Sequence, residues 1–247
     1  MRVTGSCKLR VLGAGLLALL LGGCALRPPL PAPAAGAAAT LAPHEGTPHD
    51  IVAAESLLTI RAYRGGTLGS AGHNHLIAAH ALSGTIYVPA NLMRTSFEVR
   101  LPVAELTVDE AALREQEHSG DFPPQVPDSA REGTRHNMLG EALLDAEHYP
   151  QIVLRAVRLE PAAAGADGAT VLAHIEATVR GQVHTLRVPV SYQLGAGEVT
   201  VAGETTLRQS ELGLTPFSAL LGALQVQDEM RIRFRIVARA AAGAAPR

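Results

Sequence analysis

The sequence predicts an all-β fold of about eight antiparallel strands, interrupted by one short helical segment. Three observations support this prediction. Apolar and polar side chains alternate in two long runs, one before and one after residues 109–146. Turns that contain glycine separate the alternating stretches. Between the two runs, apolar residues recur at helical spacing. This pattern leaves a two-sheet sandwich and a closed barrel as alternatives.

The first run predicts three strands. Leu58, Ile60 and Ala62 alternate with polar neighbours, and Gly65-Gly66 then predicts a flexible turn. After a segment at residues 73–80, strands are expected at residues 82–88, with a bend at a glycine, and at residues 97–103. Pro102 lacks an N–H group, so the third strand should end at a sheet edge or a bulge.

The middle of the chain predicts two helices and a loop. Residues 109–118 form the first helix, with Asp109 as its N-cap, and residues 120–133 form a proline-containing loop. Residues 135–146 form the second helix, because leucines recur there at helical spacing. Pro150 should stop this helix and lead into a strand at residues 151–158.

The second run predicts the clearest hairpin. Residues 171–180 and 185–192 alternate strictly around a turn at Gly181-Gln182. Strands at residues 199–207 and 231–238 follow. In the last strand Phe234 and its two isoleucine neighbours should face the inside, because Arg231, Arg233 and Arg235 occupy the opposite face.

The N-terminus resembles a bacterial lipoprotein signal at residues 1–23. A basic start precedes an apolar stretch too short to span a bilayer comfortably, and Leu21-Gly22-Gly23-Cys24 resembles a lipobox. This resemblance implies lipidation of Cys24. Residues 24–50 are rich in Pro and Ala and predict a tether, followed by a domain at residues 51–240 and a disordered tail at residues 241–247. Ala25 stands where an Asp would signal inner-membrane retention. We therefore expect a lipid-anchored protein of the cell envelope, on the outer membrane and facing the periplasm.

Composition excludes several classes of function. Cys7 would leave with the signal and Cys24 would be acylated, so we expect no disulfide, no thiol nucleophile and no Cys-type zinc site. Basic residues do not form a patch interleaved with aromatics, which argues against nucleic acid as a partner. The sequence has no Gly-x-Ser-x-Gly elbow. We therefore predict a protein that is not an enzyme and has no cofactor.

Four motifs resemble one known family. The junction His148-Tyr149-Pro150, the hairpin at residues 175–190 and the segments at residues 208–214 and 225–229 resemble the YceI-like family of lipocalin-like barrels associated with polyisoprenoid lipids. This resemblance covers roughly residues 51–238 and implies a closed lipocalin-like barrel rather than a sandwich. The sequence departs from the family pattern at residues 72–75, which read GHNH, and at Leu212, where the family has Phe.

The resemblance also implies a function. A barrel of about eight strands is wide enough to hold one ligand. We expect the lumen to bind a long apolar molecule, an isoprenoid or fatty chain, through side chains that line it and do no chemistry. The predicted lumen residues are Leu58, Ile60, Val99, Leu101, Val188, Val190, Ile232, Phe234 and Ile236.

Two alternatives stay open from the sequence. His73 and His75 would share one face of a strand and could meet a metal ion, which would make the protein a periplasmic metal-binding or stress-response module. The spacing supplies no third ligand. Alternatively, bulky side chains could fill the lumen, and the protein would be a structural component of the envelope.

Overall fold

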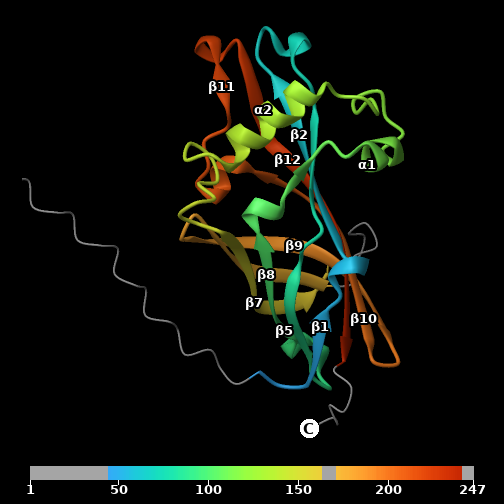
Figure 1. Cartoon of the computed structure of the whole chain (residues 1–247). Helices are drawn as coiled ribbons and strands as arrows, with labels where there is room; N and C mark the ends of the chain where they lie inside the picture. Colours follow the sequence, from blue (N-terminus) through green and yellow to red (C-terminus); the bar gives the residue numbers. More distant parts are fainter. Residues whose placement is uncertain (1–43, 163–170, 241–247) are drawn as a thin grey trace, which may run out of the picture. The chain divides into compact units, whose positions relative to one another are not determined.

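A computed structural model describes residues 44–162 and 171–240, and these residues form a closed antiparallel β-barrel with two short helices (Figure 1). The predicted all-β barrel of about eight strands is therefore confirmed. The strands are β1 (Thr47–Ile51), β2 (Leu57–Gly65), β3 (His75–Ala79), β4 (Ser83–Val88), β5 (Ser96–Pro102), β6 (Thr107–Val108), β7 (Gln151–Pro161), β8 (Val171–Val179), β9 (Gln182–Gly195), β10 (Glu198–Arg208), β11 (Ser218–Ala219) and β12 (Leu224–Ala240). The helices are α1 (Ala111–Gln116) and α2 (Asp128–Leu139).

The long strand β12 closes the barrel. The ring runs in the order β1-β4-β5-β7-β8-β9-β10-β12 and returns to β1, where Ile51 pairs with Ala238. One edge of β12 pairs with β10 along the whole length of β10. The other edge pairs first with β2 and then with β1, so that β2, β3 and β6 extend the sheet at one end. Closure leaves no free edge in the ring.

Alternation along the strands places apolar side chains in the barrel interior. In β8 the buried residues are Val171, Ala173, Ile175, Ala177 and Val179, every second residue. Arg231, Arg233 and Arg235 of β12 point outward and are exposed, as predicted. Each strand thus contributes one apolar face to the lumen, because successive side chains of a strand point to opposite faces.

The predicted hairpin is correct, but its turn lies one residue earlier than expected. The central residues are Arg180 and Gly181, with φ angles of 48° and 71°. Two consecutive positive φ angles are typical of the type I′ turn, whose twist matches that of the flanking strands. Gln182 is instead the first residue of β9.

The second helix was predicted in the wrong place. α2 begins at Asp128 and ends at Leu139, whereas the sequence predicted residues 135–146 and a loop before them. Pro127 precedes the helix and Asp128 lies in its first turn, and both features favour a helix start. Residues after Gly140 form turns, in which the N–H of Tyr149 donates to the carbonyl oxygen of Asp145 at 2.8 Å. Leu143 and Leu144 therefore lie in turns, whereas Leu139 is the last residue of α2.

Several strand boundaries also differ from the prediction. β1 occupies Thr47–Ile51, at the end of the range predicted as a tether. β12 begins at Leu224 instead of residue 231 and contains a bulge between Val226 and Met230, which breaks the alternation there. The segment at residues 73–80 contributes β3, from His75 to Ala79. The short strands β6 and β11 had no sequence signal.

Candidate functional site

An apolar cavity of about 650 Å³ occupies the barrel interior. Its walls come from most of the barrel strands, and α2 contributes one helical face with Ala130, Thr134 and Met138. All nine predicted lumen residues lie on the cavity wall: Leu58, Ile60, Val99, Leu101, Val188, Val190, Ile232, Phe234 and Ile236. That they bind a ligand stays a prediction. A volume of this size falls within the range of about 300–1,000 Å³ that is typical of ligand pockets.

Small residues keep the cavity open. Ala62, Ala173 and Ala177 line it with side chains of a single methyl group. Phe234 lies half-buried on the wall opposite Gly203 of β10, its cross-strand partner. A Cβ atom at Gly203 would approach Cζ of Phe234 to 2.6 Å, so glycine at this position leaves the space that the aromatic ring occupies beside the neighbouring strand. The ring therefore takes space at the wall rather than in the centre of the lumen.

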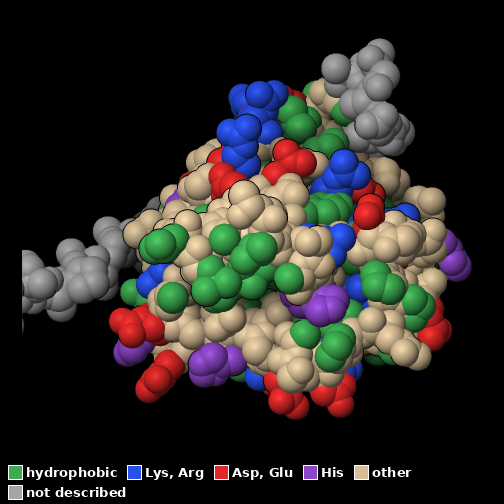
Figure 2. Space-filling model, turned by 90° about the horizontal axis from the view of Figure 1, so that it is seen from above, with side chains coloured by type: hydrophobic (Ala, Val, Ile, Leu, Met, Phe, Trp, Pro, Cys, Tyr) green, Lys and Arg blue, Asp and Glu red, His purple; other side chains and the backbone are tan. Residues whose placement is uncertain are grey.

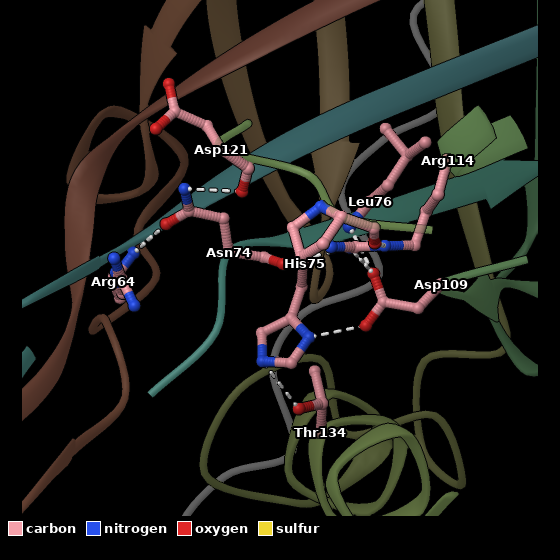
Figure 3. A network of polar contacts seen from close by, with 9 residues as sticks. Arg64, Asn74, His75, Leu76, Asp109, Arg114, Asp121 and Thr134 are labelled. Carbon is pink, nitrogen blue, oxygen red and sulfur yellow. Dashed lines mark hydrogen bonds and ion pairs between the residues drawn. The ribbon is translucent and has the colours of Figure 1, made fainter. Parts of the chain in front are cut away.

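A polar corner interrupts the apolar wall at His75 and Thr134 (Figure 3). Nδ1 of His75 lies 2.6 Å from Oδ2 of Asp109, and Nε2 lies 3.1 Å from Oγ1 of Thr134. Because Asp109 is a carboxylate, Nδ1 carries a proton and donates it. In the neutral ring Nε2 then accepts from the hydroxyl of Thr134, which ties β3 to α2.

Behind His75 lies a buried pair of charges. The side chains of Asp109 and Arg114 are both 0% exposed and are joined by an ion pair of 2.5 Å. The N–H of Leu76 also donates to Asp109 at 2.8 Å. Arg114 also donates to the carbonyl oxygens of Asn74 and Pro123. Burial by itself would raise the pKa of Asp109, but hydrogen bonds from His75 and Leu76 and the charge of Arg114 outweigh it and hold that pKa below the ordinary carboxyl value.

Asp109 is therefore not the N-cap predicted from the sequence. It has a φ of 53° and lies two residues before α1, whose N-cap residue Glu110 makes no side-chain capping hydrogen bond. A carboxylate that accepts from an arginine, a histidine and a backbone N–H is held more firmly than one at an exposed cap. Asp109 consequently points inward, and α1 starts without a capping side chain.

The geometry does not assemble a metal site around His73 and His75. Their ring centroids are 6.3 Å apart, and β3 begins only at His75, so the two residues do not share a strand face as predicted. Both ring nitrogens of His75 already lie within hydrogen-bond distance of Asp109 and Thr134. Across residues 44–162 and 171–240, no group of three or more His, Cys, Asp or Glu residues is placed to hold an ion.

The sequence missed the residues that α2 contributes to the cavity, because they were predicted to lie in a loop or in a helix that started later. The available signal was Pro127-Asp128, which is typical of a helix start. The pairing of Asp109 with Arg114 and His75 had no such signal, since it depends on the tertiary fold.

The N-terminal predictions lie outside the described residues. Cys24, the signal at residues 1–23, most of the tether and the tail at residues 241–247 are among them. In the described part of the chain, neither helix has the length and apolar character needed to cross a bilayer.

Comparisons with known proteins agree on the fold. The sequence model of the YceI-like domain matches residues 68–238. Among solved structures, BcnA of Burkholderia cenocepacia is 18% identical with a TM-score of 0.54, and the alignment covers 76% of this chain and 98% of BcnA. A polyisoprenoid binding domain from Saccharophagus degradans, implicated in plant cell wall breakdown, is 11% identical with a TM-score of 0.50, over 78% of this chain and 98% of that domain. No curated protein matches significantly.

Proposed function

Because the chain belongs to the YceI-like domain family, we propose that its barrel binds one long apolar molecule, an isoprenoid or fatty chain, and catalyses no reaction. The observation that carries this proposal is the cavity of about 650 Å³, whose wall is built mainly of Leu, Ile, Val and Ala side chains. The description of the Saccharophagus degradans domain as polyisoprenoid binding supports the same class of ligand.

Burial of methylene groups would drive binding. Each methylene that leaves water contributes about 0.8 kcal/mol, and part of this gain is offset by the lost freedom of the ligand. The nine wall residues predicted from the sequence would supply the contacts. We infer no chemical step, because His75 and Thr134 hydrogen-bond each other and His75 is held by Asp109.

Mass spectrometry with a lumen-filling variant tests this proposal. We expect native mass spectrometry of the purified protein, followed by lipid extraction, to show a bound mass in the range of isoprenoids or fatty chains. Ala173→Phe places a ring in the lumen and should remove this mass while the protein still folds, because the cavity has room for it. Val157→Phe is the matched control, since Val157 is 56% exposed on β7 and lies off the cavity wall.

Three results would count against the proposal. The wild-type protein could carry no apolar molecule after gentle purification. Ala173→Phe could retain the ligand as the wild type does. Finally, Ala173→Phe could unfold the barrel while Val157→Phe does not, which would favour a filled, structural lumen. A bound metal mass would instead favour the module predicted around His73 and His75.

We also propose that a lipid at Cys24 anchors the protein in the cell envelope, on the outer membrane facing the periplasm. The support is the lipobox-like sequence and the Pro- and Ala-rich stretch after it. Several acyl chains anchor a protein stably, whereas one does so only marginally. We expect Cys24→Ser to release the protein from the membrane fraction. Finding the variant in the membrane pellet after a high-salt wash would contradict the anchor.

A further inference from the structure

Two loops meet at the end of the barrel that carries β11 (Figure 1). The first, residues 65–72, joins β2 to β3, and the second, residues 212–226, leads from β10 through β11 into β12. The N–H of Leu68 in the first loop donates to the carbonyl oxygen of Ala223 in the second at 2.7 Å. We call the exposed apolar side chains of these loops the apolar tip: Leu68, Phe217, Leu220 and Leu221.

Two side chains of the apolar tip, Leu220 and Leu221, gain little from burial within the chain. Leu220 is 68% exposed and Leu221 is fully exposed. Both have positive φ angles, 51° and 56°, in the left-handed region that a leucine rarely adopts. Neither packing nor local conformational preference explains two leucines held in this way. Exposed apolar clusters of this kind mark surfaces that contact something outside the molecule.

The two loops also lack charge. Residues 65–72 and 212–226 contain no Asp, Glu, Lys, Arg or His, although 18% of the chain is charged. Arg64 borders the first loop and donates to the carbonyl oxygen of Gly72 at its base. Seen from above, hydrophobic side chains form a band across the middle of the molecule, and charged side chains lie on both sides of this band (Figure 2). The surface therefore matches an apolar partner rather than a charged one.

The apolar tip is continuous with the cavity. Gly72, Phe217 and Leu224 of the two loops lie on the cavity wall, so the lumen reaches the base of the tip. We propose that the apolar tip docks on a lipid bilayer and inserts Leu220 and Leu221 at the boundary between headgroups and acyl chains. An apolar ligand could then pass between the bilayer and the lumen without crossing water. The transfer of a ligand rests on the proposed function, whereas docking on the bilayer does not.

A bilayer fits the apolar tip better than a protein partner does. A protein interface combines an apolar centre with a rim of hydrogen-bonding groups. Residues 65–72 and 212–226 supply no charged side chain for such a rim. The interfacial region of a bilayer accepts separate projecting apolar side chains, and the affinity follows the apolar area that they bury.

Fluorescence provides a direct test, because the chain contains no tryptophan. The full-length chain with Cys24→Ser, which removes the expected acylation site, would carry either Leu221→Trp or Val157→Trp. With phosphatidylcholine vesicles, we expect a blue shift and quenching by brominated acyl chains at position 221 and neither at position 157. No response at position 221, or the same response at both positions, would overturn the proposal.

Charge substitution provides the second test. In the Cys24→Ser chain, Leu220→Asp with Leu221→Asp should lower vesicle binding by at least about tenfold, whereas Val157→Asp should leave it unchanged. Binding of the parent chain should change little between about 0.05 and about 0.5 M salt, because the tip is uncharged. Equal losses in the two variants would refute docking. A second result would also refute docking: the parent chain is a dimer, and the tip variant is a monomer that binds vesicles as well as the parent does. In that case a second copy of the chain would cover the tip.

The two proposals can fail separately. A protein that carries a bound apolar molecule and ignores vesicles would refute docking and leave the proposed function standing. A protein that docks on vesicles through position 221 but never carries an apolar molecule would refute the proposed function and support docking.

Discussion

Two regions of this barrel reverse the usual placement of side chains. Asp109 and Arg114 are charged and fully buried, whereas Leu220 and Leu221 are apolar and largely or fully exposed. The buried carboxylate accepts hydrogen bonds from Leu76, His75 and Arg114, so its burial is explained inside the chain. The leucines are exposed in a disfavoured backbone conformation. The difference indicates that the charged cluster serves the fold and that the apolar tip serves a contact outside it.

The largest effect is expected at the buried pair. Asp109→Ala leaves the Arg114 guanidinium buried without its carboxylate and should cost about 3–5 kcal/mol in the free energy of unfolding. The control is Asp128→Ala, which removes an exposed partner of Arg131 and should cost less than about 1 kcal/mol. Urea unfolding of both variants measures the difference. Equal, small losses would show that the buried cluster is not structural.

Substitution of two phenylalanines distinguishes a packed interior from an open lumen. Phe122 is 3% exposed beside Tyr63 and Arg114, and Phe122→Ala should cost about 3–5 kcal/mol, the usual loss for a packed ring. Phe234 lies beside an existing cavity, so Phe234→Ala should cost less and should weaken ligand binding instead. Thermal melts with and without extracted lipid measure both effects. If Phe234→Ala is as damaging as Phe122→Ala, the lumen is filled around that ring.

Acid should weaken the charged cluster. The pKa of Asp109 is lower in the folded protein than the unfolded value of about 3.9, so its contribution is complete above that pH and is lost as the pH falls through the folded pKa. Stability of the wild type should therefore decline below about pH 4 more steeply than that of Asp109→Asn. Melts over this range give the two slopes. Parallel slopes would mean that Asp109 titrates as it does in the unfolded chain.

The smallest effect on stability is expected at the apolar tip. Leu221→Asn removes a fully exposed side chain and places at φ 56° a residue that tolerates this conformation, so the melting temperature should stay the same or rise slightly. Val157→Asn should lower it slightly, because Asn is disfavoured in strands. A clear loss of stability in Leu221→Asn would show that Leu221 packs within the protein, and the contrast between the two regions would fail.

The lumen could be predicted from the sequence because alternation carries the information directly. In β12 the exposed arginines identify the opposite face as the interior, and Phe234 and Ile236 follow. The cluster around Asp109 could not be predicted in this way. His75 and Asp109 are far apart in the sequence, and the pattern around Asp109 resembles an ordinary helix start. The predicted bounds of α2 were wrong because leucines in a turn happen to recur at helical spacing.

The sequence also could not show whether the lumen is open. Its volume depends on how far apart the barrel walls stand, and the same aliphatic residues could have met in the middle. The apolar tip was missed for a related reason. Leucines in residues 212–226 look like any core segment until the fold shows which of them have neighbours.

The seam between β1 and β12 has a consequence for the order of folding. It joins Ile51 to Ala238, the first and last described strands, whereas β8 to β10 pair with close neighbours in the chain. Local hairpins form early, and contacts between distant residues form late because closing a long loop costs entropy. The barrel should therefore pass through a stage in which its sheet is assembled but its wall is open along one side. If the lumen binds an apolar chain as we propose, that open side would admit the chain before the last strand closes the ring.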